Sequence, residues 1–184
     1  MSDTQLRLDI GLSGKKSSIT DCYFTSPLKL GIPNTEGDRL KVVLMMASAG
    51  ILKGDSFAYS INCQPHTKLL LTEQSYTKIF QTGDVGAKRV QKIQIGEGAS
   101  LYYHPCATIP FAGSRFDSSL HVNMNRDSEF AYTDIVTAGR VGMGERFFYT
   151  HFSNRVTVCV EERPVWIDNC FLEPQSMDVE SMID

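Results

Sequence analysis

Four isolated charges interrupt apolar or strand-like stretches of the sequence: Asp55, Lys78, Asp134 and Asp168. Burying a charge is costly unless the charge is paired or hydrated, so a single residue of this kind usually faces solvent. Four such sites in one chain indicate an internal polar path or pocket. Carboxylates that line such a path could bind a divalent cation transiently through oxygen ligands.

The histidines and cysteines leave a second chemistry open. No two histidines form a zinc-binding pattern, and the five cysteines include no CxxC pair, so we predict no stable metal site and no tightly bound cofactor. Cys106 and His151 could form a nucleophile–base pair only if the fold brings them together. A β-fold hydrolase that uses such a Cys/His pair is therefore an alternative hypothesis.

The elements that must position these residues are mainly strands. Leu120, Val122 and Met124 alternate with polar residues, and the segments 93–95 and 156–160 repeat the pattern. Alternation with period two is typical of half-buried strands. Evidence for helices is weak, although segment 73–82 could contain a helical turn and segment 176–184 could begin a helix.

Turn-like segments recur along the chain. Each joins an alternating run to a second apolar run, and their starting points differ by 32, 29 and 35 residues; they are 63–69, 95–101, 124–130 and 159–165. This spacing indicates a loose repeat of one hairpin-like unit. Stacked units of this kind bury one continuous core, as in a solenoid or a layered sheet.

Length and composition exclude several classes of protein. A chain of 184 residues is expected to form a single domain, 1–184. The net charge of −3 argues against a nucleic-acid or anionic membrane surface, since both need clustered cations. No apolar stretch reaches the roughly 20 residues of a membrane span, and the start has no secretory signal. We therefore expect a cytoplasmic protein with reduced thiols.

Five segments together resemble one known family, the urease accessory proteins UreD, also called UreH. Their order and spacing match over most of the chain, and the UreH branch is the more similar. The matching segments are 42–55 (VVLMMASAGILKGD), 69–80 (LLLTEQSYTKIF), 98–116 (GASLYYHPCATIPFAGSRF), 132–140 (YTDIVTAGR) and 165–174 (VWIDNCFLEP).

This resemblance implies a mainly β fold, with layered sheets in a helical, β-helix-like coil and few short α-helices. It also implies a role without catalysis. Such a protein would be the scaffold of a complex with a UreF-like protein and a UreG-like GTPase, and this complex would dock on apo-urease during urease maturation. A UreE-like protein would supply nickel indirectly, and transient Ni²⁺ would pass through the scaffold to the urease active site.

The resemblance also assigns roles to individual positions. Asp55, Lys78, Asp134 and Asp168 match family positions associated with the nickel conduit. The carboxylates would be weak, exchangeable ligands, and the lysine would orient a carboxylate. The remaining matches are expected to be structural, with the glycines in tight turns or close backbone approaches and the arginine in an ion pair; they are Gly50, Gly54, Gly139 and Arg140.

Two positions depart from the family pattern, because Lys53 replaces a glycine and Asn169 stands where many members have arginine. The C-terminal part of the family is expected to be missing, which would expose an unpaired sheet edge. Besides the urease hypothesis and the hydrolase hypothesis, a plain β interaction module remains possible.

Overall fold

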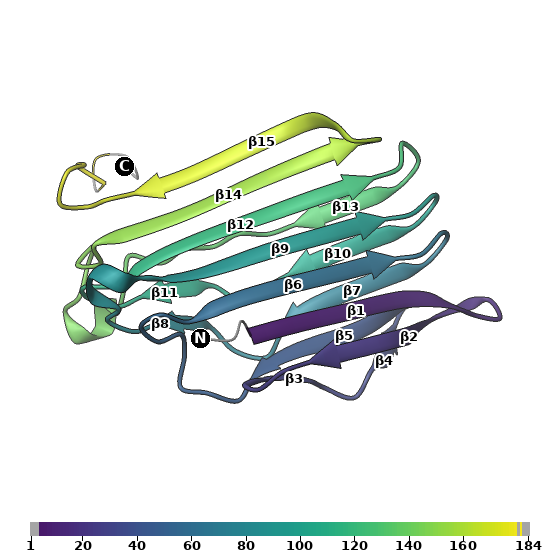
Figure 1. Ribbon diagram of the computed structural model, residues 1–184, viewed down its shortest axis with the longest axis horizontal. Helices are drawn as coiled ribbons and strands as arrows, with labels where there is room; N and C mark the ends of the chain where they lie inside the picture. The colour runs from purple at the N-terminus through teal and green to yellow at the C-terminus, as the bar shows by residue number, and fades with distance from the viewer. Residues whose placement is uncertain (1–3, 180, 182–184) are drawn as a thin grey trace.

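The computed structural model describes residues 4–179 and 181. The chain forms a β-solenoid of about four turns, with 58% of its residues in strands (Figure 1). The expected layered β coil is therefore confirmed. Between residues 4 and 179 the only helical segments are two short 3₁₀ turns, η1 (Gly83–Val85) and η2 (Val141–Met143).

The larger sheet has seven strands, and its five central neighbours β1, β6, β9, β12 and β14 run parallel. An antiparallel strand forms each edge of this sheet, since β2 pairs with β1 at one edge and β15 pairs with β14 at the other. In spatial order the strands are β15 (Arg163–Leu172), β14 (His151–Val160), β12 (Arg115–Met124), β9 (Ala87–Ile95), β6 (Ser56–Cys63), β1 (Thr4–Ser13) and β2 (Lys16–Phe24).

The second sheet faces the first across the core, and a small third sheet of two strands completes two of the coils. The second sheet consists of β13 (Glu129–Tyr132), β10 (Ser100–His104), β7 (Lys68–Glu73), β5 (Arg39–Met46) and β3 (Leu28–Leu30), with β4 (Asn34–Glu36) also paired to β5. The third consists of β11 (Thr108–Pro110) and β8 (Thr77–Ile79).

The repeated turns have a different role from the predicted hairpins. In the first three repeats, each turn carries the chain from a strand of the large sheet to a strand of the second sheet, as from β6 to β7 and from β9 to β10. Each strand then pairs with its equivalent one coil later. The hairpin interpretation is wrong for these three turns, and only 159–165 closes a true hairpin, between β14 and β15.

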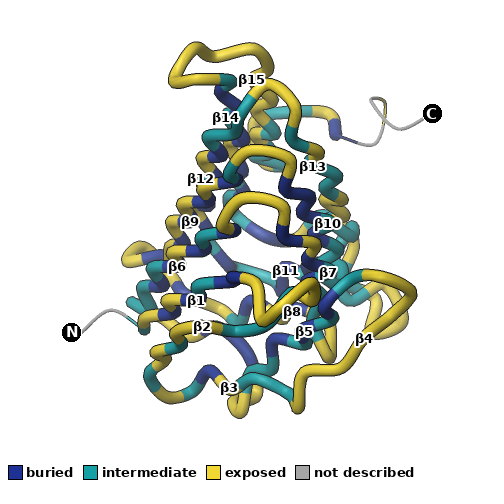
Figure 2. Tube along the Cα trace, turned by 90° about the vertical axis from the view of Figure 1, so that its right-hand side faces the viewer, coloured by how far each residue is buried: buried dark blue, intermediate teal, exposed yellow. Residues whose placement is uncertain are grey.

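The core lies between the two large sheets, and the strands alternate between buried and exposed positions (Figure 2). The pattern is clearest in β9, where every second residue from Ala87 to Ile95 is buried. One hydrophobic cluster joins inward residues of both sheets, including Ile61, Leu101 and Val122. Burial of this continuous apolar surface is the main force that holds the coils together.

The helical prediction for segment 73–82 is wrong, because this segment contains strand β8. Its backbone pairs with β11 one coil later, and this pairing outweighs the local preference for a helical turn. Of the tail helix expected in 176–184, residues 176–179 form no helix, and residues 180 and 182–184 lie outside the described residues.

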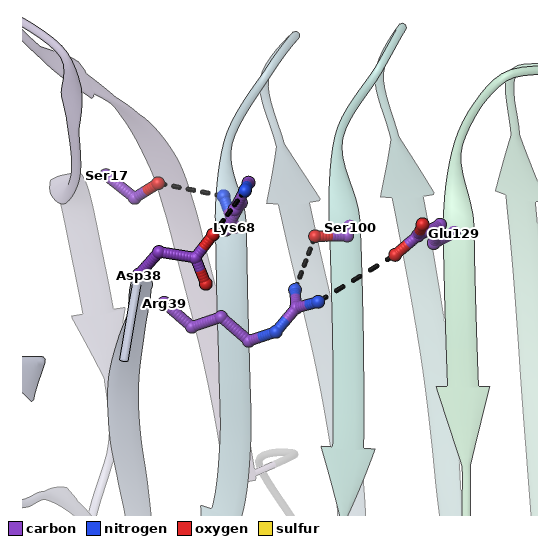
Figure 3. Close-up of polar contacts among 6 residues, drawn as sticks. All are labelled: Ser17, Asp38, Arg39, Lys68, Ser100 and Glu129. Atoms are coloured by element: carbon purple, nitrogen blue, oxygen red, sulfur yellow. Dashed lines mark hydrogen bonds and ion pairs between the residues drawn. The ribbon is translucent and has the colours of Figure 1, made fainter. Parts of the chain in front are cut away.

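Surface ion pairs link successive coils at the turn end of the second sheet (Figure 3). Arg39 donates to Ser100 Oγ, lies 3.8 Å from Glu129 Oε2, and stacks 3.6 Å from the ring centroid of Tyr102. Lys68 pairs with Asp38, and its backbone N–H donates to Ser17 Oγ at 2.8 Å. The charged and polar groups of this cluster pair with one another and thereby link strands of different coils.

Candidate functional site

A row of polar side chains crosses the inward face of the large sheet. Arg89 of β9 is in register with Ser118 of β12, which is in register with Asn154 of β14 and then Cys170 of β15. The first three are buried and the cysteine is half-buried. Neighbouring strands are about 4.8 Å apart, so these four residues, called the polar row below, form a continuous line inside the solenoid.

The polar row is incompletely hydrogen-bonded. Arg89 Nε, Ser118 Oγ and Asn154 Oδ1 are buried and have no partner in the described part of the chain. A buried polar atom without a partner costs about 1–3 kcal/mol, so three in one row need an explanation. The two oxygens are hard donors of the kind that bind divalent cations or water.

A surface pocket of about 170 Å³ lies at the β9 end of the polar row. Its lining includes Glu73, Arg89, Tyr59, Lys78 and Gly50. The volume is sufficient for several water molecules. The exposed Lys78 and the buried Arg89 both line this pocket, so it joins the protein surface to the polar row.

Glu73 is the carboxylate of this pocket. It ends β7, and its Oε1 lies 3.9 Å from Arg89 Nη1 across the space between the two sheets. Its Oε2 accepts hydrogen bonds from the backbone N–H of Cys106 at 3.2 Å and from Thr77 Oγ1 at 3.4 Å. Burial raises the pKa of Glu73, and the positive charge of Arg89 opposes this rise.

Tyrosines and a glutamine surround the same pair. Tyr103 of β10 donates from its hydroxyl to Gln91 Oε1 at 3.0 Å, in a buried hydrogen bond between the sheets. Gln91 is in register with Tyr59 of β6. Burial raises the pKa of both tyrosines above the ordinary value, so they are neutral hydrogen-bonding groups near neutral pH.

The other end of the polar row reaches Asp134. Asn154 Nδ2 donates to Asp134 Oδ2 at 2.5 Å. Burial, and then the charge of Asp134, raise the pKa of Tyr132 to about 12. Burial also raises the pKa of the Cys170 thiol, with further contributions from Asp134 and Asp168. One end of the row therefore carries two carboxylates and the other carries the Glu73–Arg89 pair.

The four predicted conduit residues occupy different places. Lys78 lines the pocket, and Asp134 is hydrogen-bonded to the polar row. Asp168 is an exposed residue of the outermost strand β15. Asp55 is half-buried and caps a turn, since its Oδ2 accepts from the backbone N–H of Leu52 at 2.7 Å. Lys78 and Asp134 are therefore exposed residues at opposite ends of the polar row, whereas Asp55 lies in a turn.

The predicted glycines and the arginine lie in turns, and Gly50 lines the pocket. Gly50, Gly54 and Gly139 have φ angles of +156°, +78° and +115°. A Cβ at Gly50 would come within 2.5 Å of the Lys78 carbonyl oxygen, so the wall of the pocket needs glycine there. Arg140 forms an ion pair with Glu145, with Nε 2.8 Å from Oε2.

Sequence reasoning missed Glu73, Arg89, Gln91, Ser118 and Asn154. The signal that could have found them is the period-two register itself. Counting back from Ile95 in steps of two places Gln91 and Arg89 on the buried face, and the same count from Val158 places Asn154 there. Polar residues at inward positions of an otherwise apolar face are candidates for a functional interior.

The Cys/His hypothesis finds no support in this geometry. Cys106 contacts Glu73, with Sγ 3.5 Å from the Glu73 carbonyl oxygen, whereas His151 Nε2 lies 2.8 Å from Asp117 Oδ1. Burial, and then the charge of Glu73, raise the pKa of the Cys106 thiol, the opposite of what an activated nucleophile requires.

The fold and the site define a β-solenoid with a row of polar side chains through its core. In the described residues, no helix is long and apolar enough to cross a membrane. The family model described as "UreD urease accessory protein" matches residues 2–183.

Curated relatives agree with this match. Urease accessory protein UreH of Helicobacter pylori (strain G27) is 34% identical over 98% of this chain and 68% of its own length. UreH of Helicobacter hepaticus is 34% identical over 97% of this chain and 70% of its own length. UreD of Acetivibrio thermocellus is 31% identical over 98% of this chain and 70% of its own length. The chain belongs to the UreD family of urease accessory proteins.

Proposed function

We propose that this protein is the scaffold of a nickel-insertion complex and that Ni²⁺ passes through its interior on the way to apo-urease. The observation that carries the proposal is the polar row with its three unpartnered atoms. It lies inside a hydrophobic solenoid, between a pocket with a carboxylate at one end and Asp134 at the other. Its oxygens can replace part of the water shell of a divalent cation.

The Glu73–Arg89 pair suits transport because a conduit must release its ion as readily as it binds it. A lone buried carboxylate would hold a dication strongly in a medium of low dielectric constant. The fixed positive charge of Arg89 offsets part of that attraction, so Glu73 is a weak ligand. Lys78 at the pocket acts in the same sense, and Asp134 and Asp168 provide carboxylates at the opposite end.

We further propose that the partners are those of urease maturation. A UreF-like protein and a UreG-like GTPase would join this scaffold on apo-urease, in the cytoplasm, with nickel brought by a UreE-like protein. The family name supports urease as the target, and the five free cysteines are compatible with a reducing compartment. The proposed role needs no catalytic residue in this chain.

The test replaces a polar-row residue by an apolar one of similar size. Asn154→Leu removes a cation ligand and an unpartnered buried oxygen, and the Asp134 carboxylate that loses its hydrogen bond is exposed to water, so the variant should still fold; circular dichroism checks this. The chain is expressed with urease and the other accessory proteins, and the nickel content of purified urease is measured by mass spectrometry. We expect the nickel content to fall several-fold while the accessory proteins still co-purify.

The matched control is Asn62→Leu, on the outward side of β6, and it should leave nickel loading unchanged. Asp134→Asn should act like Asn154→Leu. Unchanged nickel content in both polar-row variants would contradict the conduit. Loss of co-purification in these variants would assign the row to folding or assembly.

A further inference from the structure

A groove runs along β6 on the outward face of the large sheet, on the side opposite the polar row. Its floor is made of the short outward side chains of β6, namely Ser56, Ala58 and Ser60, and its volume is about 660 Å³. Longer side chains of β1 and β9 form its two walls. These walls are two strand spacings apart, about 9.6 Å, which is wide enough for one extended polypeptide.

The walls are positively charged. Arg7 of β1 is in register with Ser60, and Ser60 is in register with Lys92 of β9. Lys88 stands across from Ser56. Three cations therefore line a narrow groove on a protein whose net charge is −3.

The lysines of the groove are not held in ion pairs with described residues. Lys88 and Lys92 form no ion pair in the described part of the chain. Asp117, which is in register with Lys88, forms its ion pair with His151, whose Nε2 lies 2.8 Å from Asp117 Oδ1. Arg7 pairs with Asp21 at 2.8 Å, and both side chains are more than half exposed, so this surface pair can exchange for another carboxylate at little cost.

The β9 wall has a spacing that matches an extended chain. Lys88, Val90 and Lys92 alternate along the strand and are all exposed. Extended polypeptide advances about 6.8 Å per two residues, so a second chain alongside presents its side chains at the same interval. Two acids four residues apart, with an apolar residue midway, would face these three positions in order.

We propose that this groove, which we call the basic groove, binds an extended acidic segment of a partner protein. The groove lies in the middle of a sheet, where the backbone of β6 is already paired on both sides. Recognition therefore depends on side chains. Charge complementarity determines the sign of the partner's charge and the rate of association. Val90 and Tyr23 add apolar contacts.

A protein segment fits better than a nucleic acid. Nucleic-acid surfaces need many phosphate contacts over a broad basic area, whereas this groove offers three cations and exposed apolar side chains, Val90 at 42% and Tyr23 at 48% exposure. This surface is separate from the interior proposed for nickel, so either proposal can fail without the other.

The experiment measures binding of a fluorescent nine-residue peptide with two glutamates four residues apart and a valine midway. Fluorescence anisotropy with the purified full chain should give saturable binding, and the matched peptide with glutamines should bind at least tenfold more weakly. The double variant Lys88→Glu and Lys92→Glu should weaken binding of the acidic peptide at least tenfold. The control Lys29→Glu and Lys53→Glu makes the same charge change at exposed sites outside the groove and should leave it unchanged.

A second variant keeps the charge constant. Ala58→Trp fills the floor of the groove on an outward, half-buried position and should also weaken binding, with circular dichroism confirming the fold of every variant. Equal weakening in the control, absence of saturable binding, or no effect of the groove variants would each overturn the proposal. Tighter binding of a single-stranded oligonucleotide that displaces the peptide would also overturn it, in favour of a nucleic-acid surface.

Discussion

Replacing Glu73 by glutamine should destabilise this protein more than replacing Arg89 by methionine. Both side chains are only 9% exposed, and their charged atoms lie 3.9 Å apart between the two sheets. Removing the carboxylate leaves a buried guanidinium that cannot lose its proton. Breaking a buried pair in this way costs about 3–5 kcal/mol, a large part of the roughly 5–15 kcal/mol that stabilises a domain.

The opposite variant leaves a buried charge that can be neutralised, because a carboxylate can bind a proton whereas a guanidinium cannot lose one. In Arg89→Met the carboxyl group of Glu73 loses the cation that lowers its pKa, and burial raises this pKa further above the ordinary value of 4.5. The folded state then binds the proton more tightly than the unfolded state. Between pH 4.5 and the raised pKa, stability must therefore fall as the pH rises, by up to about 1.4 kcal/mol per pH unit.

Urea unfolding followed by circular dichroism at several pH values between 5 and 8 measures both effects. The stability of Glu73→Gln should not depend on pH through this pair, because neither the introduced amide nor the Arg89 guanidinium titrates in this range, and it should lie several kcal/mol below that of the wild type at pH 7. Arg89→Met should lose less at pH 7 and recover stability toward pH 5. A larger loss in Arg89→Met than in Glu73→Gln, or a stability of Arg89→Met that does not depend on pH, would refute this account of the pair.

Three other predictions concern single positions. Gly50→Ala should lower the free energy of unfolding by more than about 1 kcal/mol in urea titrations. The reason is that φ is +156° there and a Cβ would lie 2.5 Å from a carbonyl oxygen, which leaves no room for a side chain. The control Gly142→Ala, which has open space around it, should match the wild type. Burial raises the pKa of Cys63 to about 12, so mass spectrometry after iodoacetamide treatment at pH 8 should find this thiol labelled only in urea, and labelling in the folded protein would contradict its burial. Asp134→Asn should lower the pKa of Tyr132 from about 12, but not to 10, because the burial of the ring remains. Tyrosinate absorbance during alkaline titration measures this shift, with Asp38→Asn as the control. An unchanged pKa would show that Asp134 does not act on this ring.

Local sequence determined the strands and their spacing. Period-two alternation identified the buried faces of β9, β12 and β14, and recurring turns 29–35 residues apart indicated stacked units. The family also followed from sequence, because five short segments in a fixed order are specific even when each one is weak. These features depend on neighbours along the chain, which a sequence displays directly.

Pairing partners and the polar interior were decided by tertiary structure. Whether a turn closes a hairpin or leads to the opposite sheet depends on contacts about 30 residues away, and the turn after Cys63 does not reveal which applies. Arg89, Ser118 and Asn154 form one row only because three strands stack in a particular register. A shift of one residue in any strand would turn its polar side chain to the outside. The sequence thus determined which residues point inward along each strand, and only the stacking of the coils determined which of them meet.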